Sequence, residues 1–307
     1  MRLLIKPLRF MKPSVFLTGS SGFVGSYLQN ALENKFQFET YKRGEIPIIS
    51  AELVIHLAGL AHDMKKTNNE SAYFDVNLGL TKLIFDAFLA SVDAKVFIFI
   101  SSVKAVADSL KDILTEEQIP APETAYGKSK LEAERYLLSQ ALPVNKRLYI
   151  LRPSVIYGPN VKGNLALLKK FVSSGLPWPL AAFQNRRSYC SIQNLTFVIQ
   201  QLYTQSLVPS GIYNVVDNEP LSTNELICIM AIATGKKVRL WTIPKWVIVG
   251  ISKIGDIVKI PFNSERLDKL TESFEVSNKK LLDAIGIPLP VETREGLLKN
   301  LNHKVND

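Results

Sequence analysis

The sequence predicts an α/β fold: a doubly wound parallel sheet with a smaller C-terminal lobe interleaved with it. Apolar stretches of strand length alternate with helical patterns up to about residue 155, as parallel sheets require. Beyond that point the helices are shorter, proline pairs appear and the alternation loosens. We therefore expect a sheet domain over residues 12–155, a lobe over residues 156–307 and a basic appendage over residues 1–11.

Composition limits the classes of function. The 307 residues are 47% hydrophobic and 21% charged, which is typical of a globular chain. The net charge of +9 favours anionic partners, but no basic block interleaved with aromatic residues predicts nucleic-acid binding. Cys190 and Cys228 stand far apart, so neither a disulfide framework nor a metal site is expected.

The first residues are basic and partly apolar, as the start of a signal peptide would be. Lys6, Pro7 and Arg9 interrupt the apolar part, and a strand pattern follows at once. We expect a cytoplasmic protein with a short appendage, or with Met11 as its alternative start. No apolar run approaches the roughly 18 residues of a membrane-spanning helix, so none is expected.

A glycine-rich turn follows the first predicted strand, Val15 to Leu17, and precedes an amphipathic helix. The three glycines allow a tight turn, close approach of a pyrophosphate to the backbone, and close packing of the helix. The helix N-terminus adds free N–H groups and partial positive charge. The pattern predicts a Rossmann-type dinucleotide site, with an ordinary glycine-rich turn as the alternative; its expected residues are Gly19, Ser21, Gly22, Phe23, Val24 and Gly25.

The second predicted strand, residues 36–41, ends at Lys42 and Arg43. An acidic residue there would bond the ribose 2′-hydroxyl of NAD, whereas a basic residue pairs with the 2′-phosphate of NADP. We therefore favour NADP over NAD and include both residues in the cofactor site. The alternative is that both are solvated loop charges.

The next strand, residues 53–59, begins only about ten residues after Arg43, fewer than a crossover needs. We expect the crossover helix to be lost, with residues 46–49 as a minimal strand and an altered pocket for adenosine. His56 lies within the apolar pattern and is expected to be a core residue.

The remaining elements follow in order. A helical pattern over residues 73–88 precedes an apolar strand, residues 96–100, that ends in Ser101-Ser102. Further along we expect a charged loop at 108–124, a helix at 126–142, a strand at 148–153 and a lobe strand at 211–216. The apolar stretch 244–260 is expected to be a core helix of the lobe, with a membrane-surface helix as the alternative.

Tyr126 and Lys130 are four residues apart, which places them on one face of a helix. A phenol with a pKa near 10 is a poor acid or base at neutral pH, and a nearby ammonium lowers that pKa. The pair therefore suits a general acid/base beside a nicotinamide, in transfer of a hydride to or from a carbonyl or alcohol.

Eight motifs carry a resemblance to a known family. With them the chain resembles an extended short-chain dehydrogenase/reductase of the NAD-dependent epimerase/dehydratase family, in the branch that modifies nucleotide sugars. The motifs are TGSSGFVG (18–25), HLAG (56–59), VN (76–77), SSVK (101–104), YGKSK (126–130), LRPSVIYGP (151–159), KGNL (162–165) and NRRS (185–188).

The resemblance implies roles for individual residues. It implies Tyr126 as acid/base, Lys130 as its activator and Ser102 as a catalytic hydroxyl. It also implies a homodimer. The implied cofactor contacts include Leu57, Ala58, Gly59, Asn77 and Pro153; the implied substrate contacts are Asn164, Leu165, Arg187 and Arg266. For Arg187 the role is pairing with a substrate phosphate, and the alternative is a surface charge.

The chain departs from the family at one position. Where relatives carry a Ser or Thr, this sequence has Val103, so Ser102 must supply the hydroxyl, and Lys104 is an additional charge beside the site. The SSVK variant is similar to enzymes of bacterial surface-polysaccharide synthesis. It implies a UDP-sugar substrate, for a UDP-4-keto-6-deoxy-N-acetylhexosamine reductase or a UDP-hexose 4-epimerase.

Two other functions stay open. A reductase of a hydrophobic carbonyl compound would leave the polar groups of Asn164 and Arg187 unpaired. A non-catalytic nucleotide-sensing protein on the same fold is the other alternative.

Overall fold

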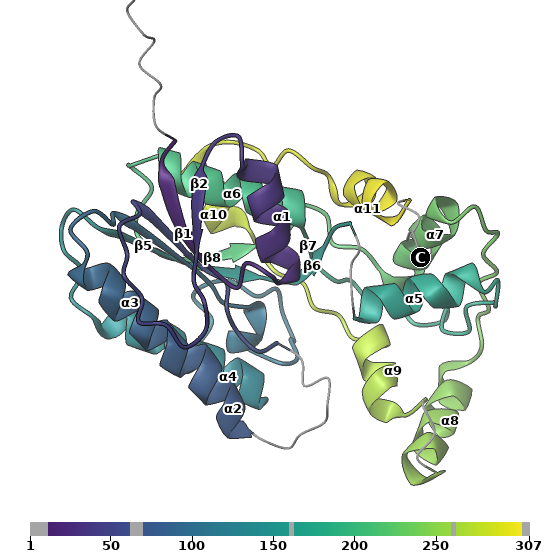
Figure 1. Ribbon diagram of the computed structural model, residues 1–307. Coiled ribbons are helices and arrows are strands. Elements are labelled where there is room, and N and C mark those ends of the chain that lie inside the picture. The colour runs from purple at the N-terminus through teal and green to yellow at the C-terminus, as the bar shows by residue number, and fades with distance from the viewer. Residues whose placement is uncertain (1–11, 62–69, 160–162, 259–261, 303–307) are drawn as a thin grey trace, which may run out of the picture.

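The computed structural model describes residues 12–61, 70–159, 163–258 and 262–302, so the appendage, Met11 and Lys162 lie outside the described residues. Six parallel strands form one sheet in the order β2-β1-β3-β4-β5-β8 (Figure 1). The α/β prediction is confirmed. The strands are β1 (Ser14–Thr18), β2 (Gln37–Thr40), β3 (Leu53–His56), β4 (Val96–Ile100), β5 (Arg147–Pro153) and β8 (Gly211–Val215).

Helices cover both faces of the sheet, because the central strands are apolar on both sides. Along β4, Val96 and Ile98 belong to the core under one set of helices, whereas Phe97 and Phe99 belong to the core under the other. The first set is α1 (Phe23–Leu32), α6 (Ile192–Thr204) and α10 (Lys279–Ile285); the second is α3 (Leu80–Ala90) and α4 (Ala125–Ser139) (Figure 1).

The connection from β2 to β3 contains neither helix nor strand. The predicted loss of the crossover helix is confirmed, and the predicted strand at residues 46–49 is wrong. Ile46 and Ile48 are 85% and 83% exposed, while Ile49 and Ala51 pack into the core that also contains α3. Since β2 and β3 flank β1 on opposite sides, the topological switch point lies between β1 and β3.

The helix predicted over residues 73–88 is interrupted. It consists of α2 (Glu70–Phe74), a π-helical turn (Asp75–Gly79) and α3. The helix predicted over residues 126–142 ends at Ser139. π-Helical turns are rare and occur frequently at functional sites, which directs attention to the buried Asn77 within this one.

A lobe with its own apolar core lies beside the sheet (Figure 1). Its helices are α5 (Asn164–Ser173), α7 (Thr223–Ala233), α8 (Lys245–Val258), α9 (Ser264–Thr271) and α11 (Thr293–Leu301), and two short strands, β6 (Val155–Tyr157) and β7 (Tyr189–Ser191), pair in parallel near its start. The strand expected at 211–216 belongs to the main sheet as β8 and not to the lobe, so the chain crosses between the two parts.

Helix α8 is not the core helix that we expected. Only Ile248, Ser252 and Gly255 are buried, and its other side is exposed. Among the described helices none combines the length and apolarity that crossing a bilayer requires. Both cysteines are free thiols, and Cys190 is buried.

Candidate active site

Two glycines bring main-chain segments close together at the carboxyl edge of the sheet, beside the switch point between β1 and β3, where folds of this kind bind ligands in a crevice. Gly19 has φ +72°, and a Cβ on it would lie 2.8 Å from the main-chain nitrogen of Ala58. A Cβ on Gly25 would collide with the carbonyl oxygen of Gly19. Only glycine therefore lets β1, the segment after β3 and the start of α1 approach so closely.

The N-terminus of α1 follows the end of β1 at this edge of the sheet. Gly22 is its N-cap residue, so no side chain occupies the free N–H groups, and no acidic residue lies in the first turn. Ser21 and Gly22 are exposed, and Val24 is partly buried. The Phe23 ring lies 3.2 Å from where a Cβ of Gly158 would stand, so it reaches the start of the lobe. These features fit the pyrophosphate of a dinucleotide.

A chain of buried hydrogen bonds supports the crevice. The Thr18 hydroxyl accepts from the main-chain nitrogens of Leu57 (3.2 Å) and Ala58 (3.1 Å) and lies 2.7 Å from His56 Nδ1. His56 Nε2 lies 2.9 Å from the Thr81 hydroxyl. The segment after β3 is thereby held against the end of β1.

His56 is a neutral core residue, as predicted. Burial, together with the charge of Lys130, lowers its pKa to about 3. The Thr81 hydroxyl donates to the carbonyl of Asn77, so it accepts from His56 Nε2–H, and Nδ1 accepts from Thr18. This network fixes one tautomer.

Asn77 joins the segment after β3 to helix α4. Its Oδ1 accepts from the main-chain nitrogen of Leu60 (2.8 Å), and its Nδ2 donates to Leu60 O (3.1 Å) and to Ser129 Oγ (2.9 Å). A Cβ on Gly59 would lie 2.8 Å from Asn77 Oδ1 and 3.1 Å from Lys130 Nζ. The structure therefore brings Gly59, Asn77 and Lys130 together.

Tyr126 and Lys130 lie in the first turns of α4, which begins after the N-cap Thr124. Lys130 Nζ donates to the carbonyl of Ile100 at 2.9 Å, and burial lowers its pKa to about 8. Burial raises the pKa of Tyr126, and its interaction with Ser102 opposes this only in part. The expected lowering of the Tyr126 pKa is therefore wrong for this structure, and the phenol is protonated at neutral pH.

A buried ion pair lies beneath these residues, and sequence reasoning missed it. Glu134 reads as part of the polar face of its helix, yet it is 1% exposed. Its carboxylate accepts from Ser101 Oγ and pairs with Arg152 Nη2 at 2.5 Å. The only signal in the sequence was an arginine inside an apolar strand. The pair ties α4 to the ends of β4 and β5.

Val103 and Lys104, which follow Ser102, have different surroundings. Val103 is buried in an apolar cluster with Val106 and Leu114, so it cannot replace the family's hydroxyl. Lys104 Nζ donates to the carbonyl of Asp108 at 2.7 Å and lies 4.3 Å from the centre of the Phe274 ring. Ser102 is the hydroxyl that remains beside Tyr126.

Arg187, a residue of the lobe, lies near Lys104. Burial is the main cause that lowers the pKa of Lys104, and Arg187 and Lys269 lower it further by their charge. Arg187 Nη1 donates to the carbonyl of Lys269, at the end of α9. Lys104, Arg187 and Lys269, which we call the basic cluster, therefore lie close enough for their charges to interact, and the charges of Asp108 and Glu272 act on Lys104 in the opposite direction.

The other expected residues are spread more widely, and their roles stay predictions. Lys42 and Arg43 are exposed directly after β2, and Pro153 is the buried last residue of β5. Asn164 is exposed at the start of α5, Leu165 is buried in the lobe core, and Arg266 is exposed on α9.

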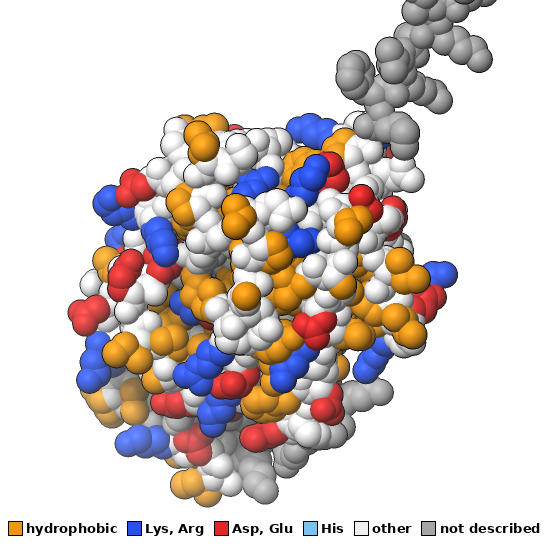
Figure 2. All heavy atoms as spheres, turned by 90° about the vertical axis from the view of Figure 1, so that its left-hand side faces the viewer, with side chains coloured by type: hydrophobic (Ala, Val, Ile, Leu, Met, Phe, Trp, Pro, Cys, Tyr) orange, Lys and Arg blue, Asp and Glu red, His pale blue; other side chains and the backbone are white. Residues whose placement is uncertain are grey.

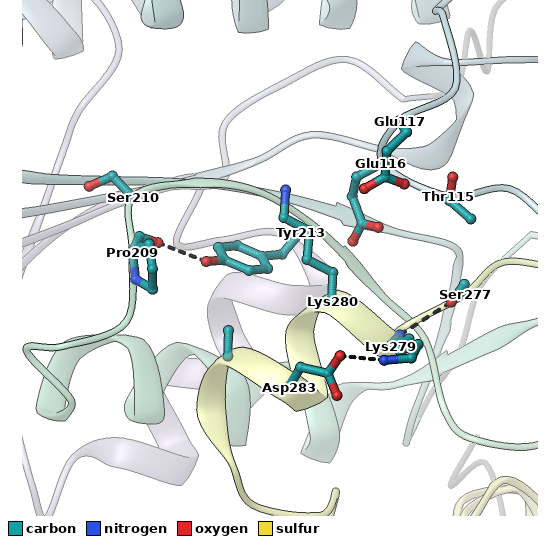
Figure 3. A pocket seen from close by; sticks show the side chains of 11 residues that line it. Thr115, Glu116, Glu117, Pro209, Ser210, Tyr213, Ser277, Lys279, Lys280 and Asp283 are labelled. Carbon is teal, nitrogen blue, oxygen red and sulfur yellow. Dashed lines mark hydrogen bonds and ion pairs between the residues drawn. The ribbon is translucent and has the colours of Figure 1, made fainter.

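A hollow of about 720 Å³ lies elsewhere, beside the edge strand β8 (Figure 3). Its polar groups already have partners: Lys279 pairs with Asp283 at 2.6 Å, and the Tyr213 hydroxyl donates to Pro209 O at 2.8 Å. Glu116 accepts from the main-chain nitrogen of Asn214 at 2.7 Å. The crevice is therefore the better candidate for the functional site.

Comparison with known proteins agrees with this geometry. Residues 45–215 match the model of the NAD dependent epimerase/dehydratase family. A UDP-glucose 4-epimerase of Vibrio cholerae is 31% identical, with 94% of each chain covered. An N-acetyl-alpha-D-glucosaminyl-diphospho-ditrans,octacis-undecaprenol 4-epimerase of Escherichia coli O157:H7 is 28% identical, with 76% of each covered. The solved structure of RMD from Pseudomonas aeruginosa with NADPH has a TM-score of 0.71 at 21% identity, covering 95% of this chain and 99% of that one.

Proposed function

Since this chain belongs to the NAD dependent epimerase/dehydratase family and is an NAD(P)-dependent enzyme, we propose that it reduces or epimerises a nucleotide sugar at C4. One observation carries the proposal. Tyr126 lies beside Ser102, and Lys130, one turn further along α4, lies beside Gly59 and Asn77, while the lobe brings Arg187 and Lys269 close to Lys104. The bound cofactor supplies or accepts the hydride at the reacting carbon.

The residues of the chain perform the proton transfer. In reduction, the protonated Tyr126 hydroxyl donates a proton to the oxygen that develops on C4, while Ser102 donates a hydrogen bond to the same oxygen. Lys130, held by Ile100 O beside Gly59, would bind the nicotinamide ribose and so complete the proton relay. The buried pair of Glu134 and Arg152 keeps α4 in register with β4 and β5.

We infer a nucleoside diphosphate sugar as substrate from the basic cluster. Lys104, Arg187 and Lys269 would attract the diphosphate, and an arginine can grip it with two parallel hydrogen bonds. A UDP-4-keto-6-deoxy-N-acetylhexosamine or a UDP-hexose fits this chemistry. A diphosphate-linked sugar on a lipid carrier is the second candidate, because helix α8 of the lobe exposes an apolar side.

Reduction is the preferred direction because the basic residues after β2 favour NADP. Lys42 and Arg43 are exposed at the end of β2, where they would favour the 2′-phosphate of NADP over NAD. Epimerisation with retained NAD is the alternative.

The first experiment is a substrate panel. Purified protein is incubated with UDP-, dTDP- and GDP-linked 4-keto sugars and either NADPH or NADH, and products are identified by chromatography and NMR. We expect oxidation of NADPH with a UDP-4-keto sugar. Tightly bound NAD⁺, together with interconversion of UDP-hexoses without added cofactor, would establish the epimerase instead.

The second experiment removes one hydroxyl. Tyr126→Phe should lower kcat about 10²–10⁴-fold, because the proton donor is lost while the ring stays in place. Tyr73→Phe is the matched control, since the Tyr73 ring lies 6.4 Å from that of Tyr126, and its kcat should change little. Unchanged turnover of Tyr126→Phe, with folding verified by circular dichroism, would favour a non-catalytic function.

We also propose a homodimer, by analogy with the family. Helices α3 and α4, which are joined by the hydrogen bond from Tyr136 to Asp86, are the expected contact. Sedimentation velocity measures the state directly. A monomer at micromolar concentration would contradict this part of the proposal without affecting the catalytic assignment.

A further inference from the structure

We propose that helix α8 and the segment before it bind the surface of an anionic lipid bilayer, so that the protein associates peripherally with membranes. This inference goes beyond the proposed function and does not depend on it. It rests on the outward face of α8, on the charges around that face and on two exposed tryptophans.

The outward face of α8 is apolar. Trp246, Ile254 and Ile257 are 77%, 58% and 81% exposed, and with Gly250 they follow the spacing of one helical face. Ile251 and Val258 flank this face at 44% and 62% exposure. A solvent-facing helix side normally carries polar residues, so this arrangement indicates a surface that is covered in use.

The inward face holds α8 firmly on the lobe. Ile248 belongs to the lobe core, and Ser252 Oγ lies 3.4 Å from Ser264 Oγ on α9. Asp256 accepts from the main-chain nitrogen of Ser264 at 3.0 Å and from its hydroxyl at 2.6 Å. Rotation of the helix to bury its apolar side would break these contacts. Figure 1 shows α8 at the outer end of the lobe, away from the sheet.

Within the segment that contains α8, the exposed charges are predominantly basic, whereas the neighbouring helix α9 carries the exposed Glu265 and Asp268. Between residues 232 and 258 the only acidic residue is Asp256, which is bonded to Ser264, whereas five exposed basic residues occur: Lys236, Lys237, Arg239, Lys245 and Lys253. On the opposite side of the molecule, basic and acidic side chains lie intermingled (Figure 2). An anionic bilayer complements the α8 region, whereas a second copy of the same surface would meet it with like charges.

Two tryptophans complete the surface. Trp241 is 52% exposed and directly precedes the turn into α8, and Trp246 lies in its first turn. Indole rings prefer the boundary between lipid headgroups and acyl chains, where the ring is buried and its N–H stays wet. Apolar residues, lysines and tryptophans together are the composition of helices that lie in a membrane interface.

Vesicle flotation tests the inference with the full chain. We expect binding to vesicles of phosphatidylcholine with phosphatidylglycerol, at least about tenfold weaker binding to phosphatidylcholine alone, and loss of binding at high salt. Trp246→Gln combined with Ile257→Gln should abolish binding. Tryptophan emission of the wild type should shift to the blue on addition of anionic vesicles.

Matched controls separate this surface from general stickiness. Val144→Gln with Leu207→Gln removes two side chains that are 106% and 94% exposed outside the α8 region, and binding should persist. Lys253→Glu should weaken binding about tenfold, whereas Lys111→Glu, an exposed residue elsewhere, should not.

Three results would overturn the inference. The first is no flotation of the wild type with anionic vesicles. The second is equal loss of binding in the control variants. The third is a wild-type oligomer, measured by light scattering without lipid, that dissociates in the Trp246→Gln and Ile257→Gln variant, because α8 would then be an interface between copies. Since activity on soluble substrates is measured separately, failure here leaves the proposed function intact.

Discussion

Arg187 illustrates how a single side chain connects the lobe to the sheet domain. Its backbone bridges Leu221 and Phe274, its guanidinium donates to Lys269 O, and its charge reaches Lys104. The neighbouring Arg186 has another environment, because it is exposed and pairs with Glu275 at 3.2 Å. Two consecutive arginines are therefore available for a matched comparison.

Arg187→Met should raise KM for the nucleotide sugar by about 10- to 100-fold, because one or two charged hydrogen bonds to the diphosphate are lost. kcat should fall much less, since the residue does not contact the reacting carbon in the proposed arrangement. Steady-state kinetics and calorimetric binding of UDP measure the effect. Arg186→Met should retain the wild-type KM, and equal effects of both substitutions would place the phosphate elsewhere.

Residues that lie together could be identified where chemistry and spacing coincide. Tyr126 and Lys130 were singled out by their separation, and Gly59 and Asn77 by their motifs. The structure places Lys130 beside Gly59 and Asn77, while the catalytic and binding roles stay predictions. Glu134 could not be found, because a glutamate on a helix is normally solvated, and only its contact with Arg152, 18 residues away, explains its burial.

At the scale of elements, the contact of β1 with α1 depends on the absence of a side chain at Gly25. A methyl group there would meet Gly19 O, and main-chain atoms of Gly19 and Ser20 cannot move away without opening the crevice. In contrast, a Cβ on Gly250, within helix α8, would meet nothing within 4 Å.

Gly25→Ala should therefore destabilise the fold by about 1–3 kcal/mol and weaken NADPH binding at least about tenfold. Urea denaturation and cofactor fluorescence titration measure the two effects. Gly250→Ala is the matched control, and it should be neutral or stabilise α8 by up to about 1 kcal/mol. Equal changes in stability and in NADPH affinity for both substitutions would show that the close contact of Gly25 with Gly19 does not determine the shape of the cofactor site.

Elements could be predicted where local patterns are sufficient. β4 is apolar on both sides and was assigned directly, and the short interval before β3 revealed the lost crossover helix. The exposed side of α8 could not be predicted. An apolar helical pattern indicates that the helix packs against another surface, but it does not indicate whether that surface belongs to the same chain. The π-helical turn also left no periodic signal that distinguishes it from an α-helix.

At the scale of the molecule, Asp217 lies where the sheet domain and the lobe meet. It follows β8, and its Oδ1 accepts from Ser191 N at 2.8 Å and from Asn194 Nδ2 at 2.7 Å. Its Oδ2 is buried, and the Tyr157 hydroxyl also acts on this carboxyl. Burial raises the pKa of Asp217 to about 6, despite these hydrogen bonds.

A raised pKa makes Asp217 oppose folding at neutral pH. The folded state binds its proton more tightly than the unfolded chain, so this contribution to stability is complete below pH 3.8 and is lost as the pH rises through about 6. The loss amounts to about 3 kcal/mol. Asp217→Asn should therefore gain stability relative to the wild type at pH 7.5 and show little difference at pH 4.

Urea denaturation of the wild type and of Asp217→Asn across this pH range measures the difference in their free energies of unfolding. The lowered pKa of His56 changes stability with pH in the opposite direction, but this effect cancels because both proteins retain His56. Asp256→Asn is the comparison, because hydrogen bonds from Ser264 lower the pKa of that exposed carboxyl, which reverses the sign. A pH-independent difference for Asp217→Asn would mean that the carboxyl stays ionised at the junction.

The overall arrangement was only partly predictable. The alternation of strands and helices ends after residue 155, which indicated a lobe. The return of β8 to the sheet depends on its pairing with β5, more than 50 residues away, as in the pairing of Tyr149 with Gly211. Local periodicity does not encode such pairings. The basic cluster of Lys104 and Arg187 likewise exists only after the lobe folds against the sheet.

The π-helical turn at Asp75–Gly79 separates two helical segments whose faces are offset from each other about the helix axis. An α-helix advances about 100° per residue, and the wider turn accommodates one extra residue, so the helical spacing before it is out of step by one residue with the spacing after it. Before the turn, the Tyr73 ring contacts the ring of Tyr126. After the turn, Ile84, Phe85 and Phe88 pack against the sheet. Removal of one residue here would convert the wide turn into a regular α-helical turn and leave the aromatic contact and the core on their present sides, so the extra residue serves the turn that holds Asn77 and not the flanking contacts.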